Sequence, residues 1–150
     1  MTKRMAVAAI ALVGLFVALY LTLYKVGVIG QLQCAVGSCE TVNTSKYSRF
    51  LGLPVAAWGL LFYLDVFAIA LIGTFAHFED EPAFAGIIVA ESAIGVLFSA
   101  WLIYLELAVI HAICIWCVTS AVIVTAILLV SIADLRETRA PGEGELPAGR

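Results

Sequence analysis

One long stretch of the chain, Leu107 to Ala133 (LAVIHAICIWCVTSAVIVTAILLVSIA), contains no Asp, Glu, Lys or Arg. Near its start lie two thiols, in Cys114-Ile115-Trp116-Cys117. A stretch of this length and composition predicts a helix that spans a membrane. Residues three apart share a helix face, so the side chains of Cys114 and Cys117 are expected to point the same way.

The spacing of this cysteine pair predicts redox chemistry. A Cys-x-x-Cys pair near the start of a helix is a natural two-electron couple, and the free backbone N–H groups there favour a thiolate at Cys114. Two other interpretations stay open from these residues alone: half of a zinc site, or two buried cysteines that pack as small apolar side chains. The other two cysteines are spaced for a loop rather than as a second ligand pair, so we expect no metal.

Composition places the whole chain in a membrane. Of its 150 residues, 63% are hydrophobic and only 13% are charged, which is unlike a soluble domain. A net charge of −3 and the absence of a basic run disfavour nucleic acid as a partner. We expect an all-α integral membrane four-helix bundle over residues 1–133, with an outer loop that carries a short helix, and a disordered cytoplasmic tail over residues 134–150.

Four segments are predicted to cross the bilayer: about Met5 to Val28, Pro54 to Ala76, Ala83 to Val109 and Ala112 to Ala133. The first is longer than the apolar part of a signal peptide and no small-residue cleavage site of the usual form follows it, so we interpret it as a span. Pro54 suits a helix start, and an acidic turn from His77 to Pro82 joins the second and third spans. Four spans place both termini on one side of the membrane and both cysteine pairs on the other.

Basic residues assign the two sides by a narrow margin. Apart from Arg150 at the far end of the tail, the side of the termini has four, against three on the cysteine side: Lys3, Arg4, Arg136 and Arg139 against Lys25, Lys46 and Arg49. This count favours cytoplasmic termini. Cysteine usage agrees, because disulfides persist in oxidising compartments. We therefore expect a multi-pass protein of the inner (cytoplasmic) membrane, with its cysteines facing the periplasm or the cell exterior.

Polar groups inside the apolar segments are candidate functional residues. Asp65 and Glu91 lie at comparable depth, either as functional acids or as a hydrogen-bonded pair that sets helix register. Glu106 and His111 lie near Cys114. Because His111 precedes Cys114 by three residues, we expect the two to share a helix face, with His111 either as a proton relay or as a hydrogen-bonded interface histidine.

Aromatic residues gather at the predicted cysteine end. Trp58, Tyr104 and Trp116 fall close to the outer ends of three predicted spans. They either belong to the aromatic belt of the membrane interface or line a pocket for a flat apolar ligand.

The first loop carries the second cysteine pair. Cys34 and Cys39 flank a Gly-Ser turn that lets the two sulfurs approach each other. The following segment, Glu40 to Phe50, is predicted to form a short helix across the mouth of the bundle, with Asn43 and Ser45 pointing toward whatever lies beneath.

Several of these motifs together resemble those of vitamin K epoxide reductase homologues. The loop and second helix of that family are similar to Cys39, Ser45, Phe50-Leu51-Gly52-Leu53-Pro54 and Trp58-Gly59. Its bacterial branch is similar to Tyr104-Leu105-Glu106-Leu107 and Ile110-His111-Ala112-Ile113-Cys114-Ile115-Trp116-Cys117. The likeness extends from the first span to about residue 133.

The resemblance implies a quinone-dependent thiol–disulfide oxidoreductase. A reduced thioredoxin-fold protein outside the membrane would donate electrons to the Cys34–Cys39 disulfide. Cys39 would then attack Cys114, and Cys117 would pass the electrons to ubiquinone or menaquinone. The thioredoxin-like domain fused to some bacterial members is missing, which implies a separate partner protein.

The resemblance and the aromatic pattern together nominate a quinone site. Its expected residues are Ser45, Trp58, Trp116, His111 and Glu106. Animal members carry an asparagine and a tyrosine where this chain has Val55 and Ala121. Reduction of quinone or vitamin K epoxide by the same cysteines is the alternative activity. A non-enzymatic membrane subunit, with its cysteines as structural staples, is the alternative without catalysis.

Overall fold

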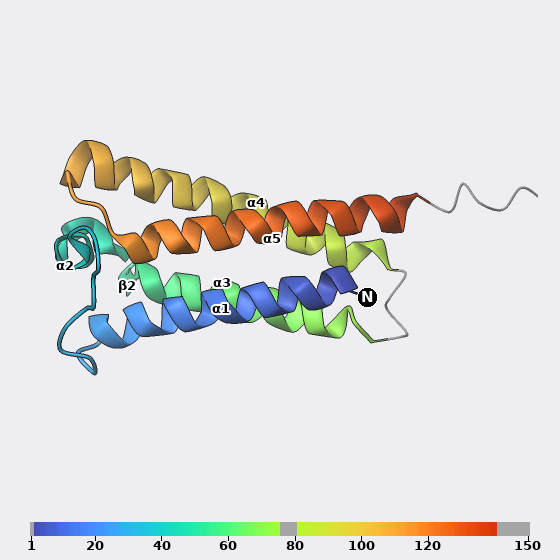
Figure 1. The fold of residues 1–150 in the computed structure, drawn as a ribbon, viewed down its shortest axis with the longest axis horizontal. Coiled ribbons are helices and arrows are strands. Elements are labelled where there is room, and N and C mark those ends of the chain that lie inside the picture. Colours follow the sequence, from blue (N-terminus) through green and yellow to red (C-terminus); the bar gives the residue numbers. More distant parts are fainter. Residues whose placement is uncertain (1, 76–80, 141–150) are drawn as a thin grey trace, which may run out of the picture.

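Four long helices run side by side in the computed structural model, which describes residues 2–75 and 81–140 (Figure 1). They are α1 (Thr2–Lys25), α3 (Val55–Ile72), α4 (Pro82–Leu105) and α5 (Ile115–Arg139). Four segments of the described chain are long enough and apolar enough to cross a membrane: Lys3–Lys25, Val55–Ile72, Pro82–Ile110 and Ile115–Arg139. The predicted all-α four-helix membrane bundle is confirmed.

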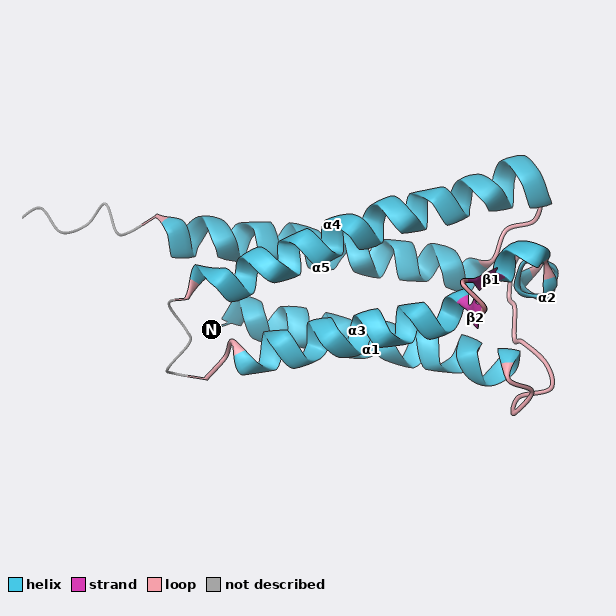
Figure 2. Cartoon of the chain, turned by 180° about the vertical axis from the view of Figure 1, so that it is seen from behind, coloured by secondary structure: helices cyan, strands magenta, loops and turns pink. Residues whose placement is uncertain are grey.

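The helices do not contact one another equally. α1 packs along α3 and α5, and α4 packs along α5, whereas α3 and α4 touch over much less of their length. Figures 1 and 2 show α4 leaning away from α3 toward the end of the bundle that carries α2. The space left between α3 and α4 is where the candidate site lies.

The tightest helix contact surrounds a buried tyrosine. Tyr63 of α3 is 1% exposed, and its hydroxyl lies 2.8 Å from Ser120 Oγ and 3.0 Å from the Ser120 carbonyl of α5. Its ring packs against Gly14 of α1, where an added Cβ would come within 2.3 Å of a ring carbon. A glycine at this position therefore brings α1 and α3 close enough to bury the ring.

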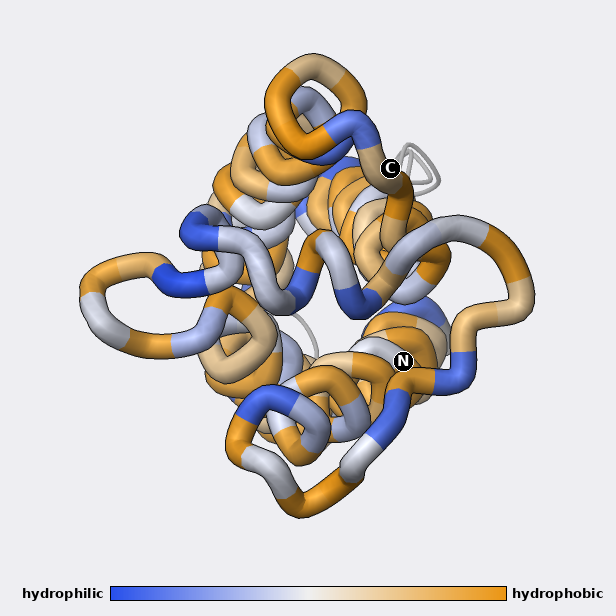
Figure 3. Tube along the Cα trace, turned by 90° about the vertical axis from the view of Figure 1, so that its left-hand side faces the viewer, coloured by the Kyte–Doolittle hydropathy of each residue, from blue (hydrophilic) through white to orange (hydrophobic). Residues whose placement is uncertain are grey.

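The loop between α1 and α3 closes one end of the bundle. It contains α2 (Cys39–Thr44), a 3-10 turn (Lys46–Ser48), β1 (Arg49–Phe50) and β2 (Leu53–Pro54). Figure 3 looks onto this end and shows the segment crossing between the four helices, with hydrophilic residues along the crossing. We call this the cysteine end, and the opposite end, where α1 begins and α5 finishes, the terminal end.

The single short helix predicted for Glu40 to Phe50 is wrong in its extent. Ser45 adopts an extended conformation (φ −62°, ψ 159°) and stops α2 at Thr44. The chain then turns into an antiparallel hairpin, because Leu51 and Gly52 both have positive φ (51° and 83°), as a two-residue hairpin turn requires.

Two other predicted helix ends shift because of backbone conformation. α1 stops at Lys25 rather than Val28, since Gly27 adopts φ 83° and terminates the helix. α3 stops at Ile72, with Gly73 as its cap, rather than at Ala76. Ala76 and residues 77–80 of the predicted acidic turn lie outside the described residues.

At the cysteine end, α4 and α5 are separated by irregular backbone. α4 continues as a π-helical segment, η2 (Glu106–Ile110), and His111 then takes a left-handed conformation with φ 56°. α5 starts at Ile115, rather than at Ala112 as predicted, and Cys114 is the residue that precedes its first turn. This break places Cys114 at a helix N-terminus.

At the terminal end, α5 runs to Arg139 rather than Ala133, so the tail predicted from residue 134 begins as helix. Arg4, 2% exposed, donates from Nε to Asp134 Oδ2 at 3.0 Å, and this ion pair joins α1 to α5. The same guanidinium donates to the carbonyls of Gly73 at 2.7 Å and Glu81 at 3.0 Å. These contacts hold the last turns of α5 against the bundle, and the tail beyond Ala140 lies outside the described residues.

Candidate active site

The two cysteine pairs meet at the cysteine end. The loop containing Cys34 and Cys39 forms an antiparallel bridge, Gly37 with Cys114, in which the Ser38 N–H donates to the Ile113 carbonyl at 2.9 Å. Gly37 has φ 94°, and a Cβ there would lie 2.2 Å from the Ile113 carbonyl oxygen. Only glycine allows the loop backbone to lie this close to the start of α5.

The cysteines follow one another from the surface inward. A disulfide joins Cys34 and Cys39, whose Cα atoms are 6.2 Å apart. Cys34 is half-buried, whereas Cys39 is 1% exposed and Cys114 is fully buried. Cys117, a free thiol like Cys114, lines a cavity inside the bundle. The predicted arrangement of both pairs at the same end is therefore what the structure shows.

Cys114 sits where its thiolate is stabilised. Its pKa is held below the ordinary thiol value first by a hydrogen bond from the Cys117 thiol, and then by backbone N–H groups of Cys117 and Trp116. Burial and the nearby Glu106 carboxylate act in the opposite direction. Asn43 of α2 places its Nδ2 3.7 Å from Cys114 Sγ while also donating to the Cys39 carbonyl at 2.9 Å.

Glu106, the first residue of η2, connects the two cysteines of α5. Its Oε2 accepts a hydrogen bond from the Cys114 N–H at 3.0 Å, and its carboxyl group lines the same cavity as the Cys117 thiol, with which it interacts electrostatically. The side chain is 2% exposed, and Oε1 is buried without a hydrogen-bond partner. Glu106 is thus a buried acid with one oxygen in use and one free.

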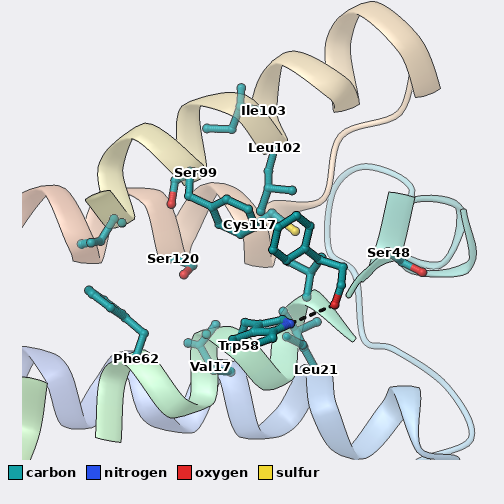
Figure 4. Close-up of a pocket in the computed structure, with 18 of the residues that line it drawn as sticks. Val17, Leu21, Ser48, Trp58, Phe62, Ser99, Leu102, Ile103, Cys117 and Ser120 are labelled. Carbon is teal, nitrogen blue, oxygen red and sulfur yellow. Dashed lines mark hydrogen bonds between the residues drawn. The ribbon is translucent and has the colours of Figure 1, made fainter. Parts of the chain in front are cut away.

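A cavity of about 440 Å³ extends from this cluster between α3 and α4 (Figure 4). Most of its wall is apolar, and Trp58 and Phe62 project into it from α3. Its polar lining includes one amide, three carboxyl groups, the Cys117 thiol and several hydroxyl groups, from Asn43, Tyr47, Ser48, Tyr63, Asp65, Glu91, Ser99, Glu106, Cys117 and Ser120. A mostly apolar cavity of this size with a few convergent polar groups suits a small organic ligand.

Two of the five predicted quinone-site residues line this cavity, namely Trp58 and Glu106. Trp58 is held there by its Nε1, which donates to the Phe50 carbonyl at 3.0 Å. Figure 4 shows that indole beside the cavity, opposite Cys117.

The other three predicted residues lie elsewhere. Ser45 is not among the lining residues, and its hydroxyl donates to the Val42 carbonyl at 2.7 Å. Trp116 is not among the lining residues: its Nε1 donates to the Gln33 carbonyl at 2.9 Å, and its partly buried ring packs on Tyr20. Trp116 therefore supports the loop rather than the cavity wall.

The prediction that His111 shares a helix face with Cys114 is wrong. His111 is exposed and lies in the left-handed turn between η2 and α5, so helical spacing does not apply across it. The residue that reaches both cysteines is Glu106, eight positions before Cys114.

Sequence reasoning missed the hydroxyls in the cavity wall. Ser120 lines the cavity and follows Cys117 by three residues, so helical spacing could have indicated that the two share a face. Asp65 and Glu91, the two acids noted at similar depth, both line the cavity, one from α3 and the other from α4. Oε2 of Glu91 is buried there without a hydrogen-bond partner.

Within the part of the chain that the structure describes, no three His, Cys, Asp or Glu side chains are grouped to hold a metal ion. The site brings together four cysteines, the carboxyl groups of Asp65, Glu91 and Glu106, and a mostly apolar cavity. A family model described as the vitamin K epoxide reductase family matches residues 5–132 of the chain. The match covers all four candidate membrane spans except the ends of the first and last.

Proposed function

The chain belongs to the vitamin K epoxide reductase family of membrane oxidoreductases, and we propose that it oxidises a thioredoxin-fold partner and reduces a membrane quinone. In this proposal it generates disulfide bonds for proteins outside the cytoplasm. The observation that carries the proposal is the inward order of its cysteines. Cys34 is half-buried in the loop, Cys39 and Cys114 are buried in one apolar cluster, and the half-buried Cys117 lines the cavity.

Electrons enter at the loop. A reduced dithiol of the partner attacks the Cys34–Cys39 disulfide at the half-buried Cys34, forms its own disulfide and leaves both loop cysteines as thiols. The Cys39 thiolate then attacks Cys114 of a Cys114–Cys117 disulfide, which releases Cys117. Attack by Cys34 on Cys39 re-forms the loop disulfide and leaves Cys114 and Cys117 reduced, the state seen in the structure.

The cavity residues fit a quinone. A flat apolar head group suits the wall that Trp58 and Phe62 provide, and Glu106 Oε1 is a buried polar atom without a partner. Cys117 in the same wall brings the reduced thiol to the ligand. The quinone supplies the two-electron oxidant, and for such a couple each difference of about 30 mV is worth about 1.4 kcal/mol.

Quinone is favoured over vitamin K epoxide by one wall residue. Val55 lines the cavity at the position where animal members carry an asparagine. An apolar side chain there offers no hydrogen bond to a ligand oxygen. The alternative in which the cysteines are only staples leaves the placement of the Cys117 thiol in the cavity wall without a role.

Cysteine variants test the electron path. Cys117→Ala is expected to lose quinone reduction and to accumulate a Cys39–Cys114 disulfide. This link forms when the Cys114 thiol attacks Cys39 of the loop disulfide and releases Cys34, and no Cys117 thiol is present to displace Cys39 from Cys114. Mass spectrometry under non-reducing conditions detects the link. Cys34→Ala is expected to lose quinone reduction with a thioredoxin-fold donor but to keep it with dithiothreitol, which can reduce Cys114–Cys117 directly. Equal loss with both donors would contradict the path.

The same path requires the cysteine end to face outward. In the cytoplasm, the glutathione and thioredoxin pools would keep an accessible Cys34 reduced. A membrane-impermeant maleimide applied to intact, reduced cells should label Cys34, while a reporter fused after Arg150 should be active only in the cytoplasm. Labelling that appears only after lysis would overturn the proposed orientation in the inner membrane.

A further inference from the structure

Glu106 has contacts that a purely structural role does not require. We propose that Glu106 is a catalytic residue, whose carboxylate takes the proton of the Cys117 thiol and delivers it from its free oxygen to an oxygen of the quinone. This inference rests on the proposed function, to which it adds the group that moves the proton.

The contacts of Glu106 place it between the thiol and the cavity. Its Oε2 accepts a hydrogen bond from the Cys114 N–H at 3.0 Å, and Glu106 and Cys117 line the same cavity. The electrostatics of the Cys117 thiol couple it to two acceptors, the Cys114 sulfur and the Glu106 carboxylate. Glu106 is therefore the carboxylate placed to take the proton of Cys117.

The second carboxyl oxygen is available to a ligand. Oε1 is buried, has no hydrogen-bond partner, and belongs to a residue that lines the cavity while being only 2% exposed. A buried acceptor without a partner is unfavourable, because it has lost its hydrogen bonds to water. A protonated Oε1 that donates to a ligand oxygen removes that cost.

Helix capping alone does not account for an acid at this position. The N-terminus of α5 needs one acceptor for the Cys114 N–H, and a glutamine would supply it with no charge to bury. The ion pairs found among the described residues, Lys3–Glu137 and Arg4–Asp134, lie at the terminal end. Glu106 is thus buried as an acid without the cation that usually accompanies one.

The backbone around Glu106 supports the same role. η2 widens the end of α4 into a π-helix, and the left-handed His111 then returns the chain toward α5. Such π-helical segments occur frequently at functional sites. Here the segment lets a side chain of α4 reach the first turn of α5.

The reaction balances with Glu106 as carrier. Glu106 removes the proton from Cys117 as its sulfur forms a bond with Cys114, and the electron pair passes to the quinone. Two S–H bonds break, one S–S bond forms and the quinone becomes a quinol. Glu106 returns to its ionised form when it donates its proton to the first quinone oxygen. The proton that the second quinone oxygen gains balances the proton that Cys114 loses.

Alkylation of Cys117 tests the base without any quinone. The chain used carries Cys34→Ser, Cys39→Ser and Cys114→Ser, which leaves Cys117 as its only cysteine, and the probe is N-ethylmaleimide in detergent. Adding Glu106→Gln keeps an acceptor for the N–H of residue 114 but removes the base, so alkylation should slow about 100-fold or more. Charge alone predicts the opposite, because removal of a nearby carboxylate makes a thiolate easier to form.

Two further variants make this result decisive. Glu40→Gln removes an exposed negative charge from the same end of the bundle and should leave alkylation at the parent rate. Glu106→Asp keeps a carboxylate and should react faster than Glu106→Gln. A parent-like rate in a folded Glu106→Gln chain, or an Asp variant as slow as the Gln variant, would overturn the proposal.

Quinone reduction separates this inference from the proposed function. A chain with Cys34→Ser and Cys39→Ser, reduced beforehand, holds its electrons on Cys114 and Cys117 and is mixed with a short-chain ubiquinone analogue. Glu106→Gln should slow quinol formation about 10²–10⁴-fold. Equal rates with and without Glu106 reject the inference alone. If neither chain reduces any quinone and the alkylation result holds, the proposed acceptor is wrong while the base remains.

Discussion

The two ends of the bundle treat buried charge in opposite ways. At the terminal end, Arg4 is 2% exposed and is bonded to a carboxylate and two backbone carbonyls from three other parts of the chain. At the cysteine end, Glu106 is equally buried, but one of its oxygens has no partner and the other is shared with groups that react. The buried charge of the terminal end is fully hydrogen-bonded, whereas the buried acid of the cysteine end has an oxygen available for a reaction.

The difference follows from what a buried charge does when it is paired. A fully bonded ion pair resists rearrangement, because moving either group leaves a charge without compensation. A carboxyl group bonded to a thiol can instead exchange a proton with it at little cost. The bundle therefore gains its rigidity at the end where α1 begins and keeps its reactive groups at the end where α3 and α4 separate.

The largest effect is expected from breaking the terminal end. Arg4→Met leaves Asp134 buried without its cation, and the free energy of unfolding should fall by about 3–5 kcal/mol. Thermal and denaturant unfolding in detergent, followed by circular dichroism, measures it. Lys3→Met is the matched control, because Lys3 pairs with the exposed Glu137 and should cost about 0–1 kcal/mol. Equal losses of unfolding free energy in the two variants would show that the Arg4–Asp134 ion pair does not stabilise the terminal end.

A smaller effect is expected from Gly37→Ala, which pushes the loop away from α5. The new Cβ would overlap the Ile113 carbonyl, so the strain should be about 1–3 kcal/mol and exchange between Cys39 and Cys114 should slow roughly 10–100-fold. Formation of the mixed disulfide in a Cys117→Ser chain reports it.

Gly52→Ala is the control for this loop variant. Gly52 also has positive φ, but nothing lies within 4 Å of an added Cβ, so it introduces backbone strain without the clash. If both variants slow cysteine exchange equally, the bridge to α5 does not position the loop pair.

A further effect is expected on the pKa of Cys114. The hydrogen bond from the Cys117 thiol is the largest cause that lowers this pKa, so Cys117→Ala should raise it. The experiment uses chains with Cys34→Ser and Cys39→Ser, and follows the ultraviolet absorbance of the thiolate against pH. A lowered pKa keeps the thiolate present as the pH falls, and the variant should lose its thiolate at a higher pH. An unchanged titration would show that Cys117 does not stabilise the thiolate.

The smallest effect is expected at Ser45, which lies at the reactive end but outside the cavity. Because its hydroxyl bonds the Val42 carbonyl, Ser45→Ala should change the KM for quinone by no more than about 0.5 kcal/mol in equivalent free energy.

Asn43→Ala, the comparison variant, removes contacts to Cys39 and Cys114 and should cost about 1–3 kcal/mol in the exchange step. A KM raised tenfold by Ser45→Ala would place Ser45 in the quinone site after all.

Helical spacing made reliable predictions only where the helix continued. It identified the four spans, since each depends on residues within one regular element. It does not extend to Cys114, which has extended backbone and precedes α5. It failed for His111, because the π-helical segment and the left-handed turn break the period before Cys114. No local sequence pattern indicated that break. It occurs where the connection from α4 to α5 crosses the cysteine end of the bundle.

What the sequence determined by itself is the fold class, the membrane location of its helices and the presence of two cysteine pairs at one end. Long uncharged runs have one solution in a bilayer, since every backbone group must be bonded within the segment. Only the tertiary structure decided which side chains enter the cavity. Ser45 and Trp116 turn away from it to satisfy loop carbonyls, while Glu106 and Ser120 turn into it, because those directions depend on how separate helices meet rather than on residue order.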